Sequence, residues 1–155
     1  MAAATHGTDV YKMEQSFGWV RAIGNNLMAQ EQTLLTVAHL GKKHEQWVGL
    51  VVDAWEKTIH YGDSFVSHMP SRLLETYQCW ITQHLSSTFT LKDLPITRQE
   101  DSSSCGVISD NALNNFALSD VTPLMKPSEV CARRMSAFIC IANCILKSLS
   151  THIFS

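Results

Sequence analysis

Hydrophobic and polar positions follow two different periods along this chain, and the periods alternate from one segment to the next. Between residues 14 and 30, apolar residues recur at steps of three and four, which predicts an amphipathic helix. Residues 33–40 and 47–54 are short apolar runs rich in β-forming residues, and the second is typical of a strand covered on both faces. Residues 57–61 alternate after a short connection at 54–56, so they predict the second arm of a hairpin.

The second half of the chain predicts further helices around one or two short strands. A helix is expected to begin at Pro70-Ser71 and to bury a stripe of apolar residues. The stripe comprises Leu73, Leu74, Tyr77, Trp80, Ile81 and Leu85. One or two short strands are expected within residues 88–97. Ser104 is expected to cap the next helix, which runs to about Leu118. A last helix of about twenty residues follows a proline-containing turn. This order predicts a single α+β domain over residues 1–155, without repeats or linkers.

Length, charge and cysteine content narrow the kind of protein. A chain of 155 residues can bury one core, and its 12 basic and 14 acidic residues give a formal charge of −2, without the basic surface of a nucleic-acid-binding protein. The N-terminus lacks the pattern of a signal peptide, and the longest apolar run, near residues 138–142, is far shorter than the ~20 residues of a membrane span. The five cysteines form no Cys-x-x-Cys pair. We therefore expect an intracellular monomer, nuclear or cytoplasmic, with reduced thiols, no nucleic-acid or membrane partner, no metal and no other cofactor.

The candidate chemistry lies in short segments at the ends of predicted elements. Gln46-Trp47 opens one predicted strand, and Asp63-Ser64 ends the next. Gln99 lies six residues before Cys105, and Asp63 lies 42 residues before it. A cysteine protease needs a thiolate, an acid that orients a histidine, and an amide donor for the oxyanion. Cys105, Asp63 and Gln99 supply those residue types.

These residues resemble the cysteine proteases that process SUMO (sentrin) and other ubiquitin-like proteins. In that family a His-Trp pair opens a strand, the strand after a tight hairpin ends in Asp-Ser, and a glutamine and a polar loop precede Cys-Gly at the start of a helix. The resemblance covers residues 33–149 and is that of a shortened, divergent, fungal-type member with a reduced N-terminal portion. It implies a papain-like fold, in which helices flank a central mixed sheet. It also implies hydrolysis of a peptide or isopeptide bond after the glycine-ended tail of a ubiquitin-like partner.

By this resemblance Cys105 is the nucleophile, Asp63 orients the base and Gln99 binds the oxyanion. Trp47 would form one wall of the channel that holds the glycine-rich tail of the substrate, and Gly106 would leave room for the substrate backbone. A cysteine in the first turn of a helix is favoured as a thiolate, and the serines before Cys105 predict that its side chain is exposed. The other cysteines fall on apolar helical faces, and we expect them to be buried structural residues. They are Cys79, Cys131, Cys140 and Cys144.

The histidine position departs from the family pattern, because Gln46 stands where the family has its histidine, 17 residues before the acid. A glutamine amide cannot take the proton of a thiol near neutral pH. His44 lies on the same face of a regular strand, roughly 6.5–7 Å further back, and reaches the site only if the chain bulges at 42–45. Three interpretations stay open: a protease that uses His44 as its base, an inactive pseudoprotease that binds a ubiquitin-like protein, and a degenerate copy without activity. His60 and His68 are expected at the surface.

Overall fold

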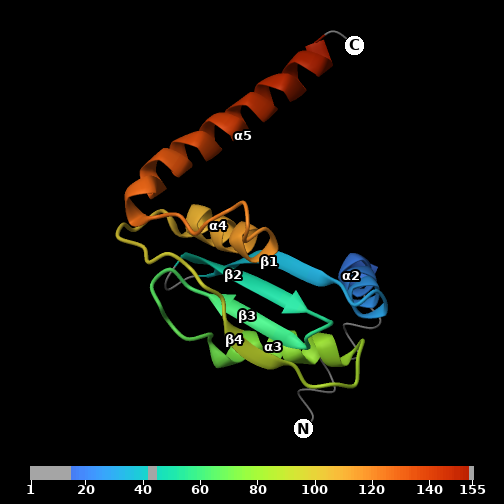
Figure 1. Cartoon of the computed structure of the whole chain (residues 1–155). Coiled ribbons are helices and arrows are strands. Elements are labelled where there is room, and N and C mark those ends of the chain that lie inside the picture. Colours follow the sequence, from blue (N-terminus) through green and yellow to red (C-terminus); the bar gives the residue numbers. More distant parts are fainter. Residues whose placement is uncertain (1–14, 42–44, 154–155) are drawn as a thin grey trace.

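The structure is a computed structural model that describes residues 15–41 and 45–153 (Figure 1). Its elements in chain order are η1 (Gln15–Phe17), α2 (Gly18–Ala29), β1 (Thr33–Leu40), β2 (Gln46–Asp53), β3 (Thr58–Gly62), α3 (Ser71–Thr82), β4 (Thr90–Asp93), α4 (Cys105–Ala117), η2 (Pro127–Glu129) and α5 (Val130–Ile153). Each predicted helix and strand is present and lies within a few residues of its predicted position.

A four-stranded mixed sheet with the strand order β1-β2-β3-β4 forms the centre of the fold. β1 pairs with β2 and β2 with β3 in antiparallel register, whereas β4 joins the other edge of β3 in parallel. Leu40 lies opposite Gln46, so the pairing of β1 with β2 reaches to Gln46, one of the predicted site residues. This arrangement confirms the predicted α+β class with a central mixed sheet.

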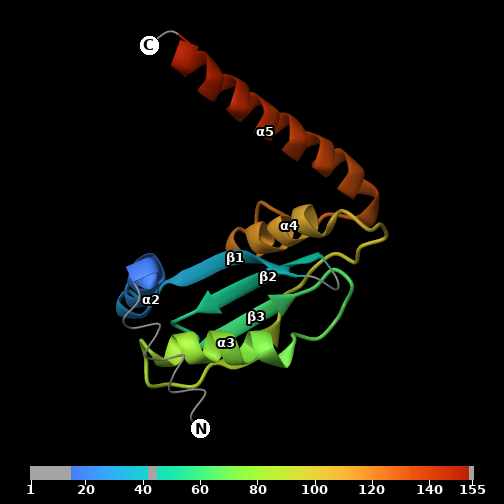
Figure 2. The ribbon, with the colours of Figure 1, turned by 180° about the vertical axis from the view of Figure 1, so that it is seen from behind.

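Helices cover both faces of the sheet: Figure 1 and Figure 2 show α3 on one face and α4 on the other. Ile81 of α3 packs with Leu50 and Ile59 on the first face. Leu113 of α4 packs with Val51 on the second face. Because β2 is covered on both sides, its valines and Leu50 are fully buried, as the continuous apolar run predicts.

α4 runs along β2 from the start of that strand. Ser109 donates a hydrogen bond to the Trp47 carbonyl at 3.1 Å, and one turn later Leu113 approaches Gly49. A Cβ at Gly49 would lie 2.9 Å from a methyl group of Leu94, so a larger residue here would displace that methyl group. Because β3 is antiparallel to β2, the end of β3 lies near the start of β2. The N-terminus of α4, the start of β2 and the end of β3 therefore meet at one end of the sheet, which we call the site end.

α5 leaves the body of the fold. Its first residue, Val130, is buried together with Ile108 and Met125. Beyond this point α5 extends away from the sheet (Figure 1 and Figure 2), and its described side chains up to Asn143 are mostly exposed. In the described part of the chain, none of the helices combines the length and the apolar character needed to cross a lipid bilayer.

Candidate active site

Gln46 and Asp63 are hydrogen-bonded to each other at the site end. Gln46 opens β2, Asp63 follows β3 by one residue, and the two residues are only 3% and 7% exposed. Gln46 Nε2 donates to Asp63 Oδ1 at 3.1 Å, and the backbone N–H of Phe65 donates to the same oxygen at 2.9 Å. The Tyr61 hydroxyl donates to Asp63 Oδ2 at 3.5 Å. The acid is thus held in place from β2, β3 and its own turn.

Hydrogen bonds offset the cost of burying the Asp63 carboxylate. Within residues 15–41 and 45–153, no lysine, arginine or histidine forms an ion pair with it. Burial, reinforced by the nearby Asp63 charge, raises the pKa of Tyr61 well above its ordinary value, so the Tyr61 hydroxyl stays a donor. An amide, a phenol and a backbone N–H therefore share the task that a cation performs in many buried acid sites.

Ser64 connects the Gln46–Asp63 pair to Gln99. Ser64 is fully buried, and its Oγ accepts from Gln46 Nε2 at 2.9 Å and donates to Gln99 Oε1 at 2.7 Å. The backbone N–H of Gln99 also donates to the Ser64 carbonyl at 2.8 Å, which fixes these two residues side by side. A continuous chain of hydrogen bonds therefore runs from Asp63 through Gln46 and Ser64 to Gln99.

The amide nitrogen of Gln99 is turned toward Asp101. It donates to the Asp101 carbonyl oxygen at 2.6 Å and to Asp101 Oδ1 at 3.3 Å. The same carboxylate accepts hydrogen bonds from the backbone N–H groups of Ser103 and Ser104. An oxyanion can use the Gln99 amide only when Nε2 turns away from Asp101, because an amide nitrogen has two hydrogens to donate.

Asp101 organises the loop before α4. The Ser104 hydroxyl, followed by the backbone N–H of Ser103, holds the pKa of Asp101 at about 2, well below its usual range. Arg134 of α5 forms an ion pair with this carboxylate at 3.5 Å, in an exposed setting where such a pair adds little stability. Ser104 holds the N-cap position, but its hydroxyl bonds to Asp101 and not to α4. The predicted side-chain cap is therefore wrong: the hydroxyl donates to Asp101, and its oxygen accepts no hydrogen bond from a backbone N–H of α4.

Cys105 begins α4 and is only 5% exposed, so the predicted exposure of this cysteine is wrong. The polar residue before it, Ser104, is also fully buried, and its hydroxyl donates to Asp101 within the loop. Trp47 lies beside the start of the helix: a Cβ at Gly106 would be 3.9 Å from the indole ring. His39 of β1 contacts the same indole, with ring centroids 4.8 Å apart. Trp47 stays 43% exposed, so it offers an aromatic surface next to the Cys105–Gly106 turn.

The other described cysteines are exposed, which corrects the prediction that they are buried. Cys79 lies on the outer side of α3, whose fully buried residue is Ile81. Cys131 and Cys140 lie on α5, which extends away from the sheet. The side chain of Cys144 lies outside the described ones. Apolar neighbours in the sequence bury a helical residue only where another element packs on the same face.

The Cys105 thiol has no hydrogen-bonded histidine in the part of the chain that the structure describes. His44 lies outside the described residues, so its role as the base stays a prediction. Glu45, directly before β2, has a left-handed φ of 35°, and the extended strand begins only at Gln46. The regular strand geometry that placed His44 relative to Gln46 therefore does not extend to Glu45.

The two histidines near the acid differ in burial. His68 is exposed, as predicted. His60 is half-buried, with its ring 4.9 Å from that of Phe116 and Nε2 3.0 Å from the Thr58 hydroxyl. Burial lowers the pKa of His60, and its surface assignment is wrong because α4 covers this side of β3. No group of three His, Cys, Asp or Glu side chains in the described ranges could hold a metal ion.

Ser64 and Asp101 are residues of this site for which the sequence suggested no role. Ser64 follows the acid in a segment where β3 has already ended at Gly62, so the alternation of strand faces no longer turns it outward. An aspartate followed by serines is a signal for a side-chain-stabilised turn, and that signal marks Asp101. Ser64 is marked in the sequence only as the second residue of the Asp63-Ser64 pair, which assigns it no contact.

The arrangement supplies a thiol at a helix start, a buried acid and a side-chain amide. The partner of the acid is a second amide, from Gln46. An amide N–H can donate to Asp63 as an imidazole N–H does, but the amide nitrogen has no basic lone pair for the thiol proton. The described residues thus bring a thiol, an acid and two side-chain amides to the site end, and the amide of Gln46 is the one that donates to the acid.

We expect a bulky maleimide to label Cys79 and Cys140 at least about tenfold faster than Cys105 in the native protein, because alkylation requires access to the sulfur. Cys105 is 5% exposed, whereas Cys79 on α3 and Cys140 on α5 are exposed. Labelling rates are read from tryptic peptides by mass spectrometry, and unfolding in guanidinium should make the rates equal. Labelling of native Cys105 as fast as Cys79 would contradict the burial described above.

No protein-family model matches the chain, and no curated protein matches its sequence. Solved structures of the SUMO protease Ulp1 are similar in fold. Ulp1 with its catalytic cysteine oxidized to a sulfenic acid matches with a TM-score of 0.62 at 15% identity, over 91% of this chain and 67% of that chain. The sulfonic acid form gives 0.58 at 19% identity, over 84% and 62%. The C-terminal Ulp1 protease domain in complex with Smt3, the yeast ortholog of SUMO, gives 0.53 at 18% identity, over 84% and 62%.

These similarities concern the fold. They confirm the predicted papain-like α+β protease fold, with helices on both sides of a mixed sheet. The chain spans 62% of the length of the first Ulp1 structures that it matches. At identities of 15–19%, the relationship to proteases of ubiquitin-like proteins is one of architecture.

Proposed function

We propose that this domain binds the glycine-ended tail of a SUMO-type ubiquitin-like protein and that its cysteine-protease activity after that tail is strongly impaired. The observation that carries the proposal is the 3.1 Å hydrogen bond from Gln46 Nε2 to Asp63. The Gln46 amide therefore donates to Asp63 at the position where a cysteine protease needs an imidazole that can take the thiol proton. Cys105 keeps its place at the start of α4, and none of the histidines within residues 15–41 and 45–153 is hydrogen-bonded to it.

The class of partner follows from the surface beside Cys105. Trp47 is 43% exposed and lies against Gly106, so an aromatic wall stands next to a residue without a side chain. An extended glycine-rich tail suits such a surface, because two backbones can approach closely where neither carries side chains. The Ulp1 domain of similar fold is in complex with Smt3, which supports a SUMO-type protein as the partner.

A second candidate, an active peptidase with His44 as the base, is favoured by one observation. The φ of 35° at Glu45 takes the backbone out of the extended form directly before Gln46. A change of this kind at a strand start re-aims neighbouring side chains. In this case Cys105 would attack, Asp63 would orient the base, and Gln99 would bind the oxyanion after leaving Asp101.

Calorimetric titration with a SUMO-type protein that ends in Gly-Gly tests the proposal. We expect Trp47→Ala to weaken binding at least about tenfold, because it removes the wall of the tail site. Trp55→Ala is the matched control: Trp55 is 69% exposed in the β2–β3 turn, at the opposite end of the sheet, and its loss should leave binding unchanged.

Two results would overturn this proposal. Wild-type protein that fails to bind, or that loses affinity equally with Trp47→Ala and Trp55→Ala, has no tail site beside Cys105. Robust hydrolysis by the wild type that His44→Ala abolishes would replace impaired catalysis with the second candidate. Hydrolysis is followed with the same ubiquitin-like protein carrying a fluorogenic group on its C-terminal glycine.

A further inference from the structure

α5 carries an apolar stripe with the spacing of a coiled coil. The stripe, which we call the α5 stripe, consists of Cys131, Met135, Phe138, Ala142, Ile145 and Leu149. Its members follow one another at alternating steps of four and three residues. This spacing keeps one side of a helix facing a partner helix over several turns. The side chains from residue 144 onward lie outside the described ones, so the structural argument uses the first half of the stripe.

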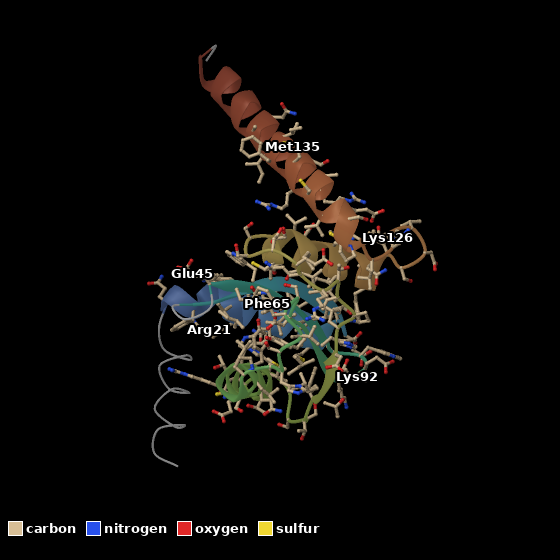
Figure 3. The ribbon with its side chains drawn as sticks, turned by 90° about the vertical axis from the view of Figure 1, so that its left-hand side faces the viewer. Arg21, Glu45, Phe65, Lys92, Lys126 and Met135 are labelled. Carbon is tan, nitrogen blue, oxygen red and sulfur yellow. The ribbon has the colours of Figure 1, made fainter. Side chains whose placement is uncertain are left out.

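The first half of the α5 stripe faces solvent. Met135 is 59% exposed and Phe138 is 68% exposed, and the neighbouring Ile139 and Ile141 are 52% and 60% exposed. Figure 3 shows Met135 on the projecting part of α5, well clear of the sheet. A helix without tertiary packing is marginal in water, because most helix stability comes from covering its apolar face. We therefore expect the exposed residues of the α5 stripe to pack against a partner surface.

The exposed area suits pairing with a second helix. A large apolar side chain offers on the order of 150–250 Å². Met135, Phe138, Ile139 and Ile141 are each more than half exposed, so together they leave roughly 400 Å² of apolar surface. A stable interface buries about 800 Å² per partner, a little over half of it apolar. The described half of the helix supplies most of that apolar area.

The distribution of charge favours a second copy of this chain over an anionic lipid surface. Residues 1–129 contain all 14 acidic residues and nine of the 12 basic ones, a formal net charge of −5. Residues 130–155 contain three basic residues and no acidic one, a formal net charge of +3. An acidic body opposes approach to an anionic membrane, whereas a second copy offers its acidic body to the basic helix. Arg133 and Lys147 are 14 residues, or two heptads, apart, so they share one position on the helix, and that position lies outside the α5 stripe. None of the six residues of the α5 stripe is charged.

We propose that α5 pairs antiparallel with α5 of a second copy of this chain through the α5 stripe. The 24 residues of α5 span ~36 Å, and the helix leaves the body at its N-terminal end. Antiparallel pairing therefore places the two acidic bodies at opposite ends of the helix pair, and it brings the C-terminal half of each helix, which carries Lys147 and no acidic residue, toward the acidic body of the other copy. The dimer uses neither Cys105 nor Asp63, and it replaces the monomer expected from the sequence.

Sedimentation equilibrium of the full chain tests the pairing. We expect the wild type to be dimeric at micromolar concentrations and Phe138→Asp to raise the dissociation constant at least about tenfold, because it places a charge in the apolar seam. Ser136→Asp is the matched control: it adds the same charge two residues earlier, on an exposed position off the stripe, and should leave the constant unchanged. Phe138 is 68% exposed, so both variants should keep the folded body, as thermal unfolding will show.

Leu149→Cys tests the orientation. An antiparallel pair brings position 149 beside the partner's Cys131, so mild oxidation should give a disulfide between these positions on peptide mapping. A disulfide between two copies of Cys131 would overturn the antiparallel arrangement. A monomeric wild type, or equal behaviour of Phe138→Asp and Ser136→Asp, would overturn the pairing itself. The same holds for a monomer that binds vesicles of anionic phospholipid and loses that binding with Phe138→Asp, since lipid would then cover the stripe.

Discussion

Gln46→His should raise the rate at which this domain hydrolyses a SUMO-type C-terminal reporter by on the order of 10²-fold or more. Gln46 Nε2 already lies 3.1 Å from Asp63 Oδ1, so an imidazole at this position inherits an acceptor that fixes its tautomer and stabilises its protonated form. The second ring nitrogen can then take the proton of Cys105. Release of the fluorogenic group, followed at substrate concentrations below saturation, gives kcat/KM for the variant and the wild type.

Two further variants isolate the base as the cause of this gain. Gln46→Asn keeps an amide at the same position and should stay as slow as the wild type. Gln46→His combined with Cys105→Ser should lose the gained activity, because the thiol is gone. If Gln46→His binds the ubiquitin-like protein normally but hydrolyses it at the wild-type rate, then Cys105, Asp63 and position 46 do not form one catalytic group.

β2 and α3 show why the fold could be predicted from the sequence. The apolar run of β2 needed both faces covered, and α3 and α4 provide that cover. Pro70 holds the extended N-cap position of α3, with a φ of −59° and a ψ of 132°, as expected of a residue that starts a helix from an extended chain. Such signals are local, so they are present in the sequence itself. The similarity to Ulp1 structures confirms the architecture that they imply.

The contacts of the candidate site were less predictable than its residues. The family spacing marks Asp63, Gln99 and Cys105, but the hydrogen bonds that link Asp63 to Gln99 through Gln46 and Ser64 depend on how three distant segments converge. Ser64 joins Gln46 to Gln99 only because the chain leaves β3 before it and turns its hydroxyl inward. No local pattern encodes that convergence, so the chain of hydrogen bonds is visible only in three dimensions.

Burial of the cysteines failed as a prediction for a related reason. Polar neighbours suggested an exposed Cys105, yet the loop folds its serines toward Asp101 and leaves the thiol 5% exposed. Apolar neighbours suggested a buried Cys140, yet the part of α5 that carries it extends away from the sheet. The residues around a helical position indicate how apolar that face of the helix is. The residue is buried only where another element packs against the same face.

Gln46→Ala should lower the free energy of unfolding by about 2–4 kcal/mol, the other large effect that we expect at this position. The change removes the donor to the buried Asp63 carboxylate and the donor to the buried Ser64 hydroxyl. A buried charged acceptor that loses a hydrogen bond costs more than the bond itself contributes, and the lost side chain leaves a cavity. Asp63 keeps its bonds from Phe65 and Tyr61, which limits the loss. Urea unfolding, followed by circular dichroism, measures the difference.

Two comparisons separate this effect from the general cost of shortening a glutamine. Gln32→Ala, at an exposed position before β1, should change the free energy of unfolding by no more than about 0.5 kcal/mol. Gln46→His should lose less than Gln46→Ala, because the imidazole keeps an N–H for Asp63. If Gln46→Ala instead stays within about 0.5 kcal/mol of the wild type, then Phe65 and Tyr61 alone satisfy the buried acid. Gln46 would in that case be replaceable at little cost in stability, and the same position would be open to a histidine.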